Sequence, residues 1–218
     1  MQIEIWSDVV CPWCWVGKAR FETAVDLLGW NDTDATVTYR PFELDPSLAA
    51  GGRPIAEYLR AKFGSAATVE AIEGRVSEAG AGVGLTFDWD RVIRVNTFDA
   101  HRLLTWALTE HGQRQQRSLK ERMMRAYFAE GADVSDHEVL AGLAADTGLD
   151  GAAAGDVLAT DRHAVDVRDA EAQAATLGIN AVPTFVVEGT FGIPGAQDID
   201  TFVGLLPRLR GRLAETAR

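Results

Sequence analysis

The sequence predicts an α/β fold of β–α–β plus β–β–α order that is interrupted by a large all-helical insertion. A strand–helix–strand pattern fills the first 45 residues, almost only helical periods run from residue 55 to about residue 177, and strand character returns at residue 184. We therefore expect residues 1–50 and 178–218 to form one discontinuous domain, with residues 51–177 as a helical insertion domain.

The first unit begins with Gln2–Ser7, in which apolar and polar residues alternate as in a half-buried strand. A helix is expected to follow Cys11, because Pro12 suits the first helical position, where the missing N–H costs nothing. Gly29 is a typical stop for this helix, and Thr36–Phe42 has the composition of a second strand. The unit therefore places Cys11 at a junction between strand and helix.

The middle segment follows Gly51–Pro54, where two glycines and a proline break the first pattern. Large apolar residues then recur at helical spacing, as in the series Leu119, Met123, Met124, Tyr127 and Phe128. Ser135 and Glu138 have the spacing of a capping box, which predicts another helix ahead of Leu140.

The end of the chain predicts a hairpin and a last helix. Thr184–Val187 is rich in β-branched and aromatic residues, and Glu188-Gly189 favours a tight turn into Thr190–Ile193. Asp198 can cap a helix that runs up to Pro207, where the proline is expected to kink it.

The composition narrows the classes of partner. The formal net charge is −11, so the chain repels nucleic-acid phosphates and anionic lipid headgroups, and neither nucleic acid nor membrane is an expected partner. No uncharged apolar stretch approaches 18 residues, the length that would indicate a membrane span. The first ten residues lack the basic start of a secretory signal, which makes the cytoplasm the expected compartment.

Cys11 and Cys14 are the two cysteines of the chain, separated by Pro12 and Trp13. One such pair is no stabilising disulfide framework, whereas C-x-x-C at a strand–helix junction indicates thioredoxin-like redox chemistry. Free N–H groups and the helix dipole favour a thiolate at Cys11, and Cys14 lies one turn away on the same side. We expect Cys11 to be the nucleophile and Cys14 to resolve the mixed disulfide.

Two other interpretations of the pair stay open. A structural zinc site needs about four ligands, and the histidines at positions 101, 111, 137 and 163 have no ligand spacing to the cysteines, so no metal is predicted. Inert core cysteines are common in proteins, but the position after a strand and at a helix start favours the redox role.

Four segments together resemble the DsbA-like thioredoxin-fold family, most closely its FrnE-like cytoplasmic branch. They are residues 7–18 (SDVVCPWCWVGK), 95–107 (VNTFDAHRLLTWA), 125–150 (RAYFAEGADVSDHEVLAGLAADTGLD) and 179–197 (INAVPTFVVEGTFGIPGAQ). The branch is often associated with polyketide biosynthesis. Related proteins include 2-hydroxychromene-2-carboxylate isomerases and kappa-class glutathione transferases.

The resemblance implies a thioredoxin fold split by a helical domain, and thiol:disulfide oxidoreductase activity on protein or small-molecule thiols and disulfides. It implies no bound cofactor beyond the redox-active Cys11–Cys14 disulfide, with an external thiol donor such as glutathione. It further implies that the Val182–Pro183 bond is cis and faces the cysteines, supporting the site together with Pro12 and Trp13. His101 would then lie over the active face as a candidate for substrate contact.

The sequence also departs from the family pattern. Trp13 stands where the DsbA prototype has a histidine, so we expect a weaker oxidant. Many relatives bury a carboxylate six residues before the first cysteine, where this chain has Ile5. Asp8 is an alternative proton acceptor, although a loop or capping role is the expected one. His101 has a second interpretation as a satisfied histidine on an amphipathic helix.

Three functions are compatible with these observations. The favoured one is a cytoplasmic dithiol–disulfide oxidoreductase. A glutathione-dependent isomerase or transferase would share the split fold, but those relatives generally lack the second cysteine and use serine at the first. A redox-linked chaperone would need little more than the apolar face around Trp13.

Overall fold

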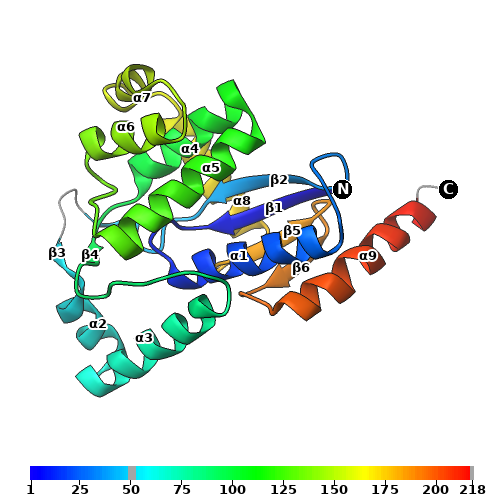
Figure 1. Ribbon diagram of the computed structural model, residues 1–218. Helices are drawn as coiled ribbons and strands as arrows, with labels where there is room; N and C mark the ends of the chain where they lie inside the picture. The colour runs from blue at the N-terminus through cyan, green and yellow to red at the C-terminus, as the bar shows by residue number, and fades with distance from the viewer. Residues whose placement is uncertain (49–52, 217–218) are drawn as a thin grey trace.

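The computed structural model describes residues 1–48 and 53–216, and its centre is a four-stranded mixed sheet (Figure 1). The sheet has the order β2-β1-β5-β6, in which β1 and β2 are parallel and the other neighbours are antiparallel. Its strands are β1 (Gln2–Ser7), β2 (Thr36–Pro41), β5 (Thr184–Val187) and β6 (Phe191–Pro194). The predicted α/β fold with its helical insertion is therefore confirmed.

Helices cover both faces of this sheet. On one face, α1 (Pro12–Leu27) and α9 (Ile199–Thr216) lie side by side and bury the apolar side of the central strand (Figure 1). The core between them contains Ile3, Ile5, Phe21, Phe185, Phe202 and Leu206. On the other face, α8 (Ala164–Thr176) packs its alanines against Trp6 and Val186. The alternation of β1 thus supplies both layers, because successive side chains of a strand point to opposite faces.

The helical segment between β2 and β5 carries a second core. Its helices are α2 (Ile55–Phe63), α3 (Ala66–Ala81), α4 (Phe98–His111), α5 (Gln113–Arg125), a π-helical turn (Ala126–Glu130), α6 (His137–Asp146) and α7 (Gly151–Leu158). Two short strands, β3 (Arg53–Pro54) and β4 (Ile93–Arg94), pair in the same segment, which the helical periods alone did not predict. The division at residues 51 and 177 remains a prediction, and residues 49–52 lie outside the described residues.

The helical core reaches the cysteines. Its buried residues include Cys11, Cys14 and Trp15 together with Leu103, Met123 and Phe128. The start of α1 therefore packs against the helical segment, while the rest of α1 packs on the sheet. Among the described residues, no helix is both long and apolar enough to cross a membrane.

Three local details differ from the sequence-based predictions: the start of β6, the cap of α6 and the length of α9. In the hairpin, Glu188 (φ 50°) and Gly189 (φ 62°) take the left-handed conformation of a two-residue turn, but the second strand begins at Phe191 rather than Thr190. The cap of α6 is Asp136, whose carboxylate accepts from the Glu138 and Val139 amides, and not Ser135. Asp136 directly precedes the first helical residue, so its carboxylate reaches the free amides of the first turn.

The last helix continues past Pro207 to Thr216, further than the predicted stretch up to the proline, and the kink expected at Pro207 stays a prediction. Leu206 and Leu209 are both buried against the core, on either side of the proline. Their burial holds the two parts of α9 on the same surface, which offsets the hydrogen bond that a proline removes from a helix.

Candidate active site

Cys11 stands at the start of α1, shortly after the end of the inner strand β1. It is the N-cap residue with an extended backbone, and its carbonyl accepts from the Cys14 amide at 3.0 Å. Its thiol donates a weak hydrogen bond to the Val182 carbonyl, with 3.8 Å between sulfur and oxygen. The Val182–Pro183 peptide bond is cis. The fold thus brings the start of α1 beside a loop that lies 171 residues further along the chain.

Close packing fixes that loop against α1. A Cβ atom at Gly17 would lie 2.9 Å from Cγ of Pro183 and 3.2 Å from Cβ of Ala196. The Arg20 guanidinium also donates to the Ala196 carbonyl at 2.9 Å. Glycine at position 17 therefore permits the approach that sets Pro183 next to the cysteine helix.

The two thiols differ in their surroundings, although both are free and buried. Burial raises the pKa of Cys14 well above its ordinary value, and the neighbouring Cys11 sulfur raises it further. The positive charge of Lys120 opposes this rise. Cys11 instead lines a cavity, so it is the sulfur that an incoming group can reach. This asymmetry matches an outer attacking thiol and an inner resolving thiol.

Lys120, which the sequence analysis did not assign to the site, lies behind the cysteines. Its side chain is fully buried, and its one hydrogen-bond acceptor among the described residues is the Ser7 carbonyl at 3.3 Å. Burial lowers the pKa of Lys120 to about 8, against the attraction of Cys14, Asp8 and Cys11. The signal in the sequence is a lysine within the apolar stripe of a helix, next to Leu119.

Asp8 and His101 form a buried pair close to the cysteines. Nε2 of His101 lies 3.3 Å from Oδ1 of Asp8, and the Leu44 amide donates to Oδ2 at 2.8 Å. Burial alone would raise the pKa of Asp8, but His101, the Leu44 amide and Lys120 together hold it below its ordinary value. Asp8 is thus a built part of the site, beyond the loop or capping role expected for it.

His101 faces Asp8 and is 2% exposed, so it offers almost no surface to a substrate. This geometry fits the interpretation as a satisfied buried histidine better than direct substrate contact. Its contact with Asp8 joins α4 to the loop before Cys11.

A cavity of about 390 Å³ opens beside Cys11, and we call it the Cys11 cavity. Cys11, Pro12 and Trp13 form its wall at the start of α1. The remainder comes from the loop before Cys11, the segment after β2, helices α2 and α3, the segment around β4 and the π-helical turn after α5. Trp13 is 37% exposed, so it marks the boundary between this cavity and solvent. All sequence-predicted residues of the C-x-x-C motif except Cys14 therefore line one hollow.

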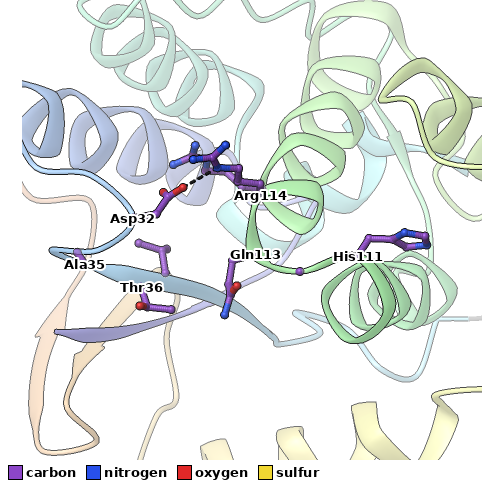
Figure 2. A pocket seen from close by; sticks show the side chains of 9 residues that line it. Asp32, Ala35, Thr36, His111, Gln113 and Arg114 are labelled. Atoms are coloured by element: carbon purple, nitrogen blue, oxygen red, sulfur yellow. Dashed lines mark hydrogen bonds and ion pairs between the residues drawn. The ribbon is translucent and has the colours of Figure 1, made fainter.

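A larger pocket of about 510 Å³ lies elsewhere, between the start of β2 and the junction of α4 with α5 (Figure 2). Its labelled residues include His111 and the ion pair of Asp32 with Arg114. It contains none of the residues named above for the cysteine site. Within the described ranges, no group of three His, Cys, Asp or Glu side chains has an arrangement suited to a metal ion.

Comparison with known proteins places this geometry in context. Residues 2–207 match the DSBA-like thioredoxin domain family. A structure described as a probable DsbA oxidoreductase from Streptomyces coelicolor is 38% identical, with a TM-score of 0.88 over 97% of this chain and 90% of that one. The uncharacterized protein YwbO of Bacillus subtilis is 29% identical over 93% of this chain and 94% of its own.

A more distant structure shares the fold. The cytosolic disulfide reductase DsbM from Pseudomonas aeruginosa, solved with GSH, is 18% identical and superposes with a TM-score of 0.65 over 100% of both chains.

Proposed function

We propose that this chain, which belongs to the DSBA-like thioredoxin domain family, exchanges thiols and disulfides through Cys11 and Cys14. Family membership and the similar DsbA oxidoreductase support disulfide oxidoreductase activity in general. The observation that carries the residue assignment is the position of Cys11, at the start of α1, against Val182 and on the wall of a cavity.

The proposed reaction divides the work between the two sulfurs. The Cys11 thiolate attacks a substrate disulfide R–S–S–R′, so that a Cys11–S–S–R bond forms and R′–S⁻ leaves and takes a proton. Cys14 then loses its proton and attacks Cys11, which releases R–SH. The substrate gains two electrons and the chain is left with a Cys11–Cys14 disulfide, which two molecules of an external thiol such as glutathione reduce again.

Lys120 supports the second step. The Cys14 thiol must ionise in a place where burial opposes ionisation, and the Lys120 ammonium is the cation that lowers the pKa of Cys14 there. Lys120 acts through Cys14 and is a positioning residue. The Val182 backbone, beside a proline without an N–H, would pair with an extended segment of a protein substrate.

We further propose a reductase or isomerase direction in the cytoplasm. A reducing compartment keeps the pair as dithiol, and dithiol is the form that reduces disulfides. DsbM, a cytosolic disulfide reductase, has the same fold. The link to polyketide biosynthesis stays a prediction.

The first test is reduction of insulin with dithiothreitol as electron donor. We expect turnover by the unmodified chain and a loss of at least about 1,000-fold in Cys11→Ser, because the thiolate is the nucleophile. Ser7→Ala, a buried hydroxyl next to the site, is the matched control and should keep turnover within a few-fold. Undiminished reduction by Cys11→Ser would refute the proposal.

The second test separates the two cysteines. The chain has no third cysteine, so each single variant leaves one thiol to follow by mass spectrometry. Cys14→Ser should accumulate a mixed disulfide with substrate at Cys11, because the resolving thiol is gone. Accumulation in Cys11→Ser instead would reverse the assignment.

The same variants test the two alternative functions. Suppression of aggregation that survives both substitutions would favour the chaperone function. A glutathione-dependent isomerisation that survives loss of Cys14 would favour the isomerase.

A further inference from the structure

The walls of the Cys11 cavity are mostly apolar. Besides Trp13, its aromatic residues are Tyr58, Phe63, Trp89, Tyr127 and Phe128. Ten of the described valine, leucine and isoleucine residues also line it, five of them from α2 and α3 and five from other segments. An empty space of about 390 Å³ lies in the usual size range of small-molecule sites.

Polar atoms on these walls are engaged with the protein itself. Oη of Tyr127 donates to the Ile93 carbonyl at 2.5 Å, and Nε1 of Trp89 donates to Ser77 at 2.9 Å. Nζ of Lys62 donates to Oη of Tyr58 at 3.0 Å. The Tyr127 hydroxyl and the Trp89 N–H are therefore already paired within the protein.

The charged side chains of the lining carry both signs, and two of its three cations among the described residues, Lys62 and Arg75, are exposed to solvent. Arg94 forms an ion pair with Asp45 and lies over the Tyr58 ring at 4.0 Å. Asp8 and Glu73 add negative charge to the same lining. A ligand with free carboxylates, such as glutathione, would lose water in this cavity without gaining a free cation from Arg94.

The aromatic wall is also fixed in place. Phe128 stacks on Trp15 with 5.6 Å between ring centroids and meets Phe87 edge to face at 5.2 Å. Phe87 in turn stacks on Trp89 at 5.1 Å. A preformed apolar surface binds an apolar group without first ordering side chains, which saves conformational entropy.

We propose that the Cys11 cavity binds the aromatic or bulky apolar group of a small organic thiol or disulfide, and so selects the sulfur compound that Cys11 exchanges with. This substrate class rests on the proposed disulfide exchange at Cys11. A glutathione-like peptide ligand is the competing occupant, and the test below distinguishes the two.

The test measures exchange at Cys11 in the Cys14→Ser protein. Starting from its mixed disulfide with glutathione, an added thiol R–SH attacks Cys11, glutathione leaves as the free thiol, and no electrons are gained or lost overall. The two probes are 2-phenylethanethiol and 2-mercaptoethanol, and intact mass spectrometry gives each equilibrium constant. The same exchange in the urea-unfolded protein supplies the intrinsic ratio.

We expect the folded protein to prefer 2-phenylethanethiol over 2-mercaptoethanol by roughly tenfold or more beyond the unfolded ratio, because the phenyl ring leaves water. A folded ratio equal to the unfolded ratio overturns the inference while disulfide exchange at Cys11 stands. A preference for glutathione over both probes overturns it in favour of the peptide ligand. Failure of all three thiols to bond with Cys11 would instead refute the proposed function.

Two variants of α3 localise the effect. Ile72 lines the cavity and Ala71 is exposed next to it on the same helix. In the Cys14→Ser background, Ile72→Trp should fill the space and bring the preference down to near the unfolded ratio, whereas Ala71→Trp should keep it. A folded Ile72→Trp protein with the full preference overturns the inference, and the ratio in Cys14→Ser alone decides the matter if Ile72→Trp does not fold.

Discussion

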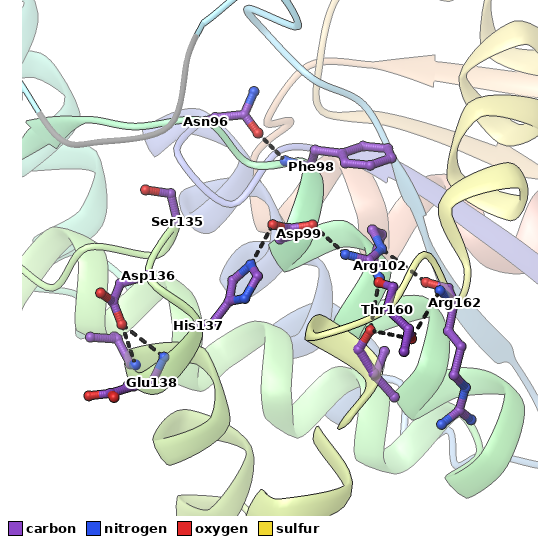
Figure 3. A network of polar contacts seen from close by, with 12 residues as sticks. Asn96, Phe98, Asp99, Arg102, Ser135, Asp136, His137, Glu138, Thr160 and Arg162 are labelled. Carbon is purple, nitrogen blue, oxygen red and sulfur yellow. Dashed lines mark hydrogen bonds and ion pairs between the residues drawn. The ribbon is translucent and has the colours of Figure 1, made fainter. Parts of the chain in front are cut away.

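Two buried cations of the helical segment, Arg102 on α4 and Lys120 on α5, are held in opposite ways. The Arg102 guanidinium donates to Asp99 at 2.6 Å (Figure 3). It also donates to the carbonyls of Val157, Thr160 and Arg162. Lys120 has one acceptor among the described residues, at 3.3 Å, and lies among the thiols and Asp8. A buried charge with its partners complete serves packing, whereas one that lacks partners is costly and points to chemistry.

The comparison predicts its largest effect at Arg102. Arg102→Met leaves the carbonyls of Thr160 and Arg162 without this donor, so we expect the free energy of unfolding to fall by about 3 kcal/mol. Arg125→Met, at a mostly exposed arginine of α5, is the control and should change it by less than about 0.5 kcal/mol. Urea denaturation measures both, and equal losses would break the distinction.

The second prediction concerns the pH dependence that Lys120 adds to stability. With a pKa of about 8, Lys120 releases its proton in the folded chain before it does so in the unfolded chain, where the value is 10.5. The unfolded state then binds more protons between these values, so this contribution to stability increases as pH rises from about 8 to 10.5.

We therefore expect the unmodified chain to gain about 2–3 kcal/mol over Lys120→Met across that range. Urea denaturation under reducing conditions gives the free energy of unfolding of both proteins at pH 7.5 and pH 10. Subtracting the value of Lys120→Met from that of the unmodified chain at each pH removes the contributions of thiols and tyrosines. The exposed Lys62→Met is the control that should show no such gain. If the difference in free energy of unfolding between the unmodified chain and Lys120→Met is the same at both pH values, Lys120 is not buried as described above.

A third prediction follows the same substitution into the chemistry. Lys120→Met removes the cation that lowers the pKa of Cys14, so closure of the Cys11–Cys14 disulfide should slow by about tenfold at pH 7. Rapid-quench analysis of a preformed Cys11 mixed disulfide measures closure directly. Arg102→Met should close at the unmodified rate, and slowing in both variants would indicate a general loss of structure.

The smallest effect is expected at His137, which reaches the other oxygen of Asp99 at 2.7 Å from a half-exposed position (Figure 3). His137→Ala should lower the free energy of unfolding at pH 7 by less than about 0.5 kcal/mol, because solvent screens exposed pairs. Thermal unfolding checks this, and a loss comparable with that of Arg102→Met would show that Asp99, and not burial, governs the network.

The elements that the sequence predicted best are those that neighbouring residues decide. Pro12 at a helix start, the Glu188-Gly189 turn and the alternation of Gln2–Ser7 each have a local physical cause, and the structure has all three. The cysteine pair belongs to the same class, because the distance between the two residues depends on one helical turn.

The features that the sequence did not reveal depend on contacts between distant segments. In the sequence Lys120 resembles any helical lysine, and its burial depends on the packing of α5 near the end of β1. Asp8 resembles a loop residue, and its role depends on contact with His101, which is 93 positions away in the chain. Pro207 weakens the helix locally by removing a hydrogen bond, but Leu209 keeps the following part of α9 on the core. In each case tertiary burial overrides the local preference.

The insertion of β5 beside β1 has a consequence for biosynthesis. The ribosome makes Cys11 early, but the loop with Val182 and Pro183 emerges about 170 residues later, which at 5–20 residues per second is roughly 10–35 s. Throughout that interval the nascent dithiol has neither its opposing loop nor strand β5. The nascent chain therefore exposes Cys11 and Cys14 before the loop with Val182 and strand β5 have been synthesised. A thiol-alkylating reagent should modify Cys11 far faster in chains on stalled ribosomes than in the released protein.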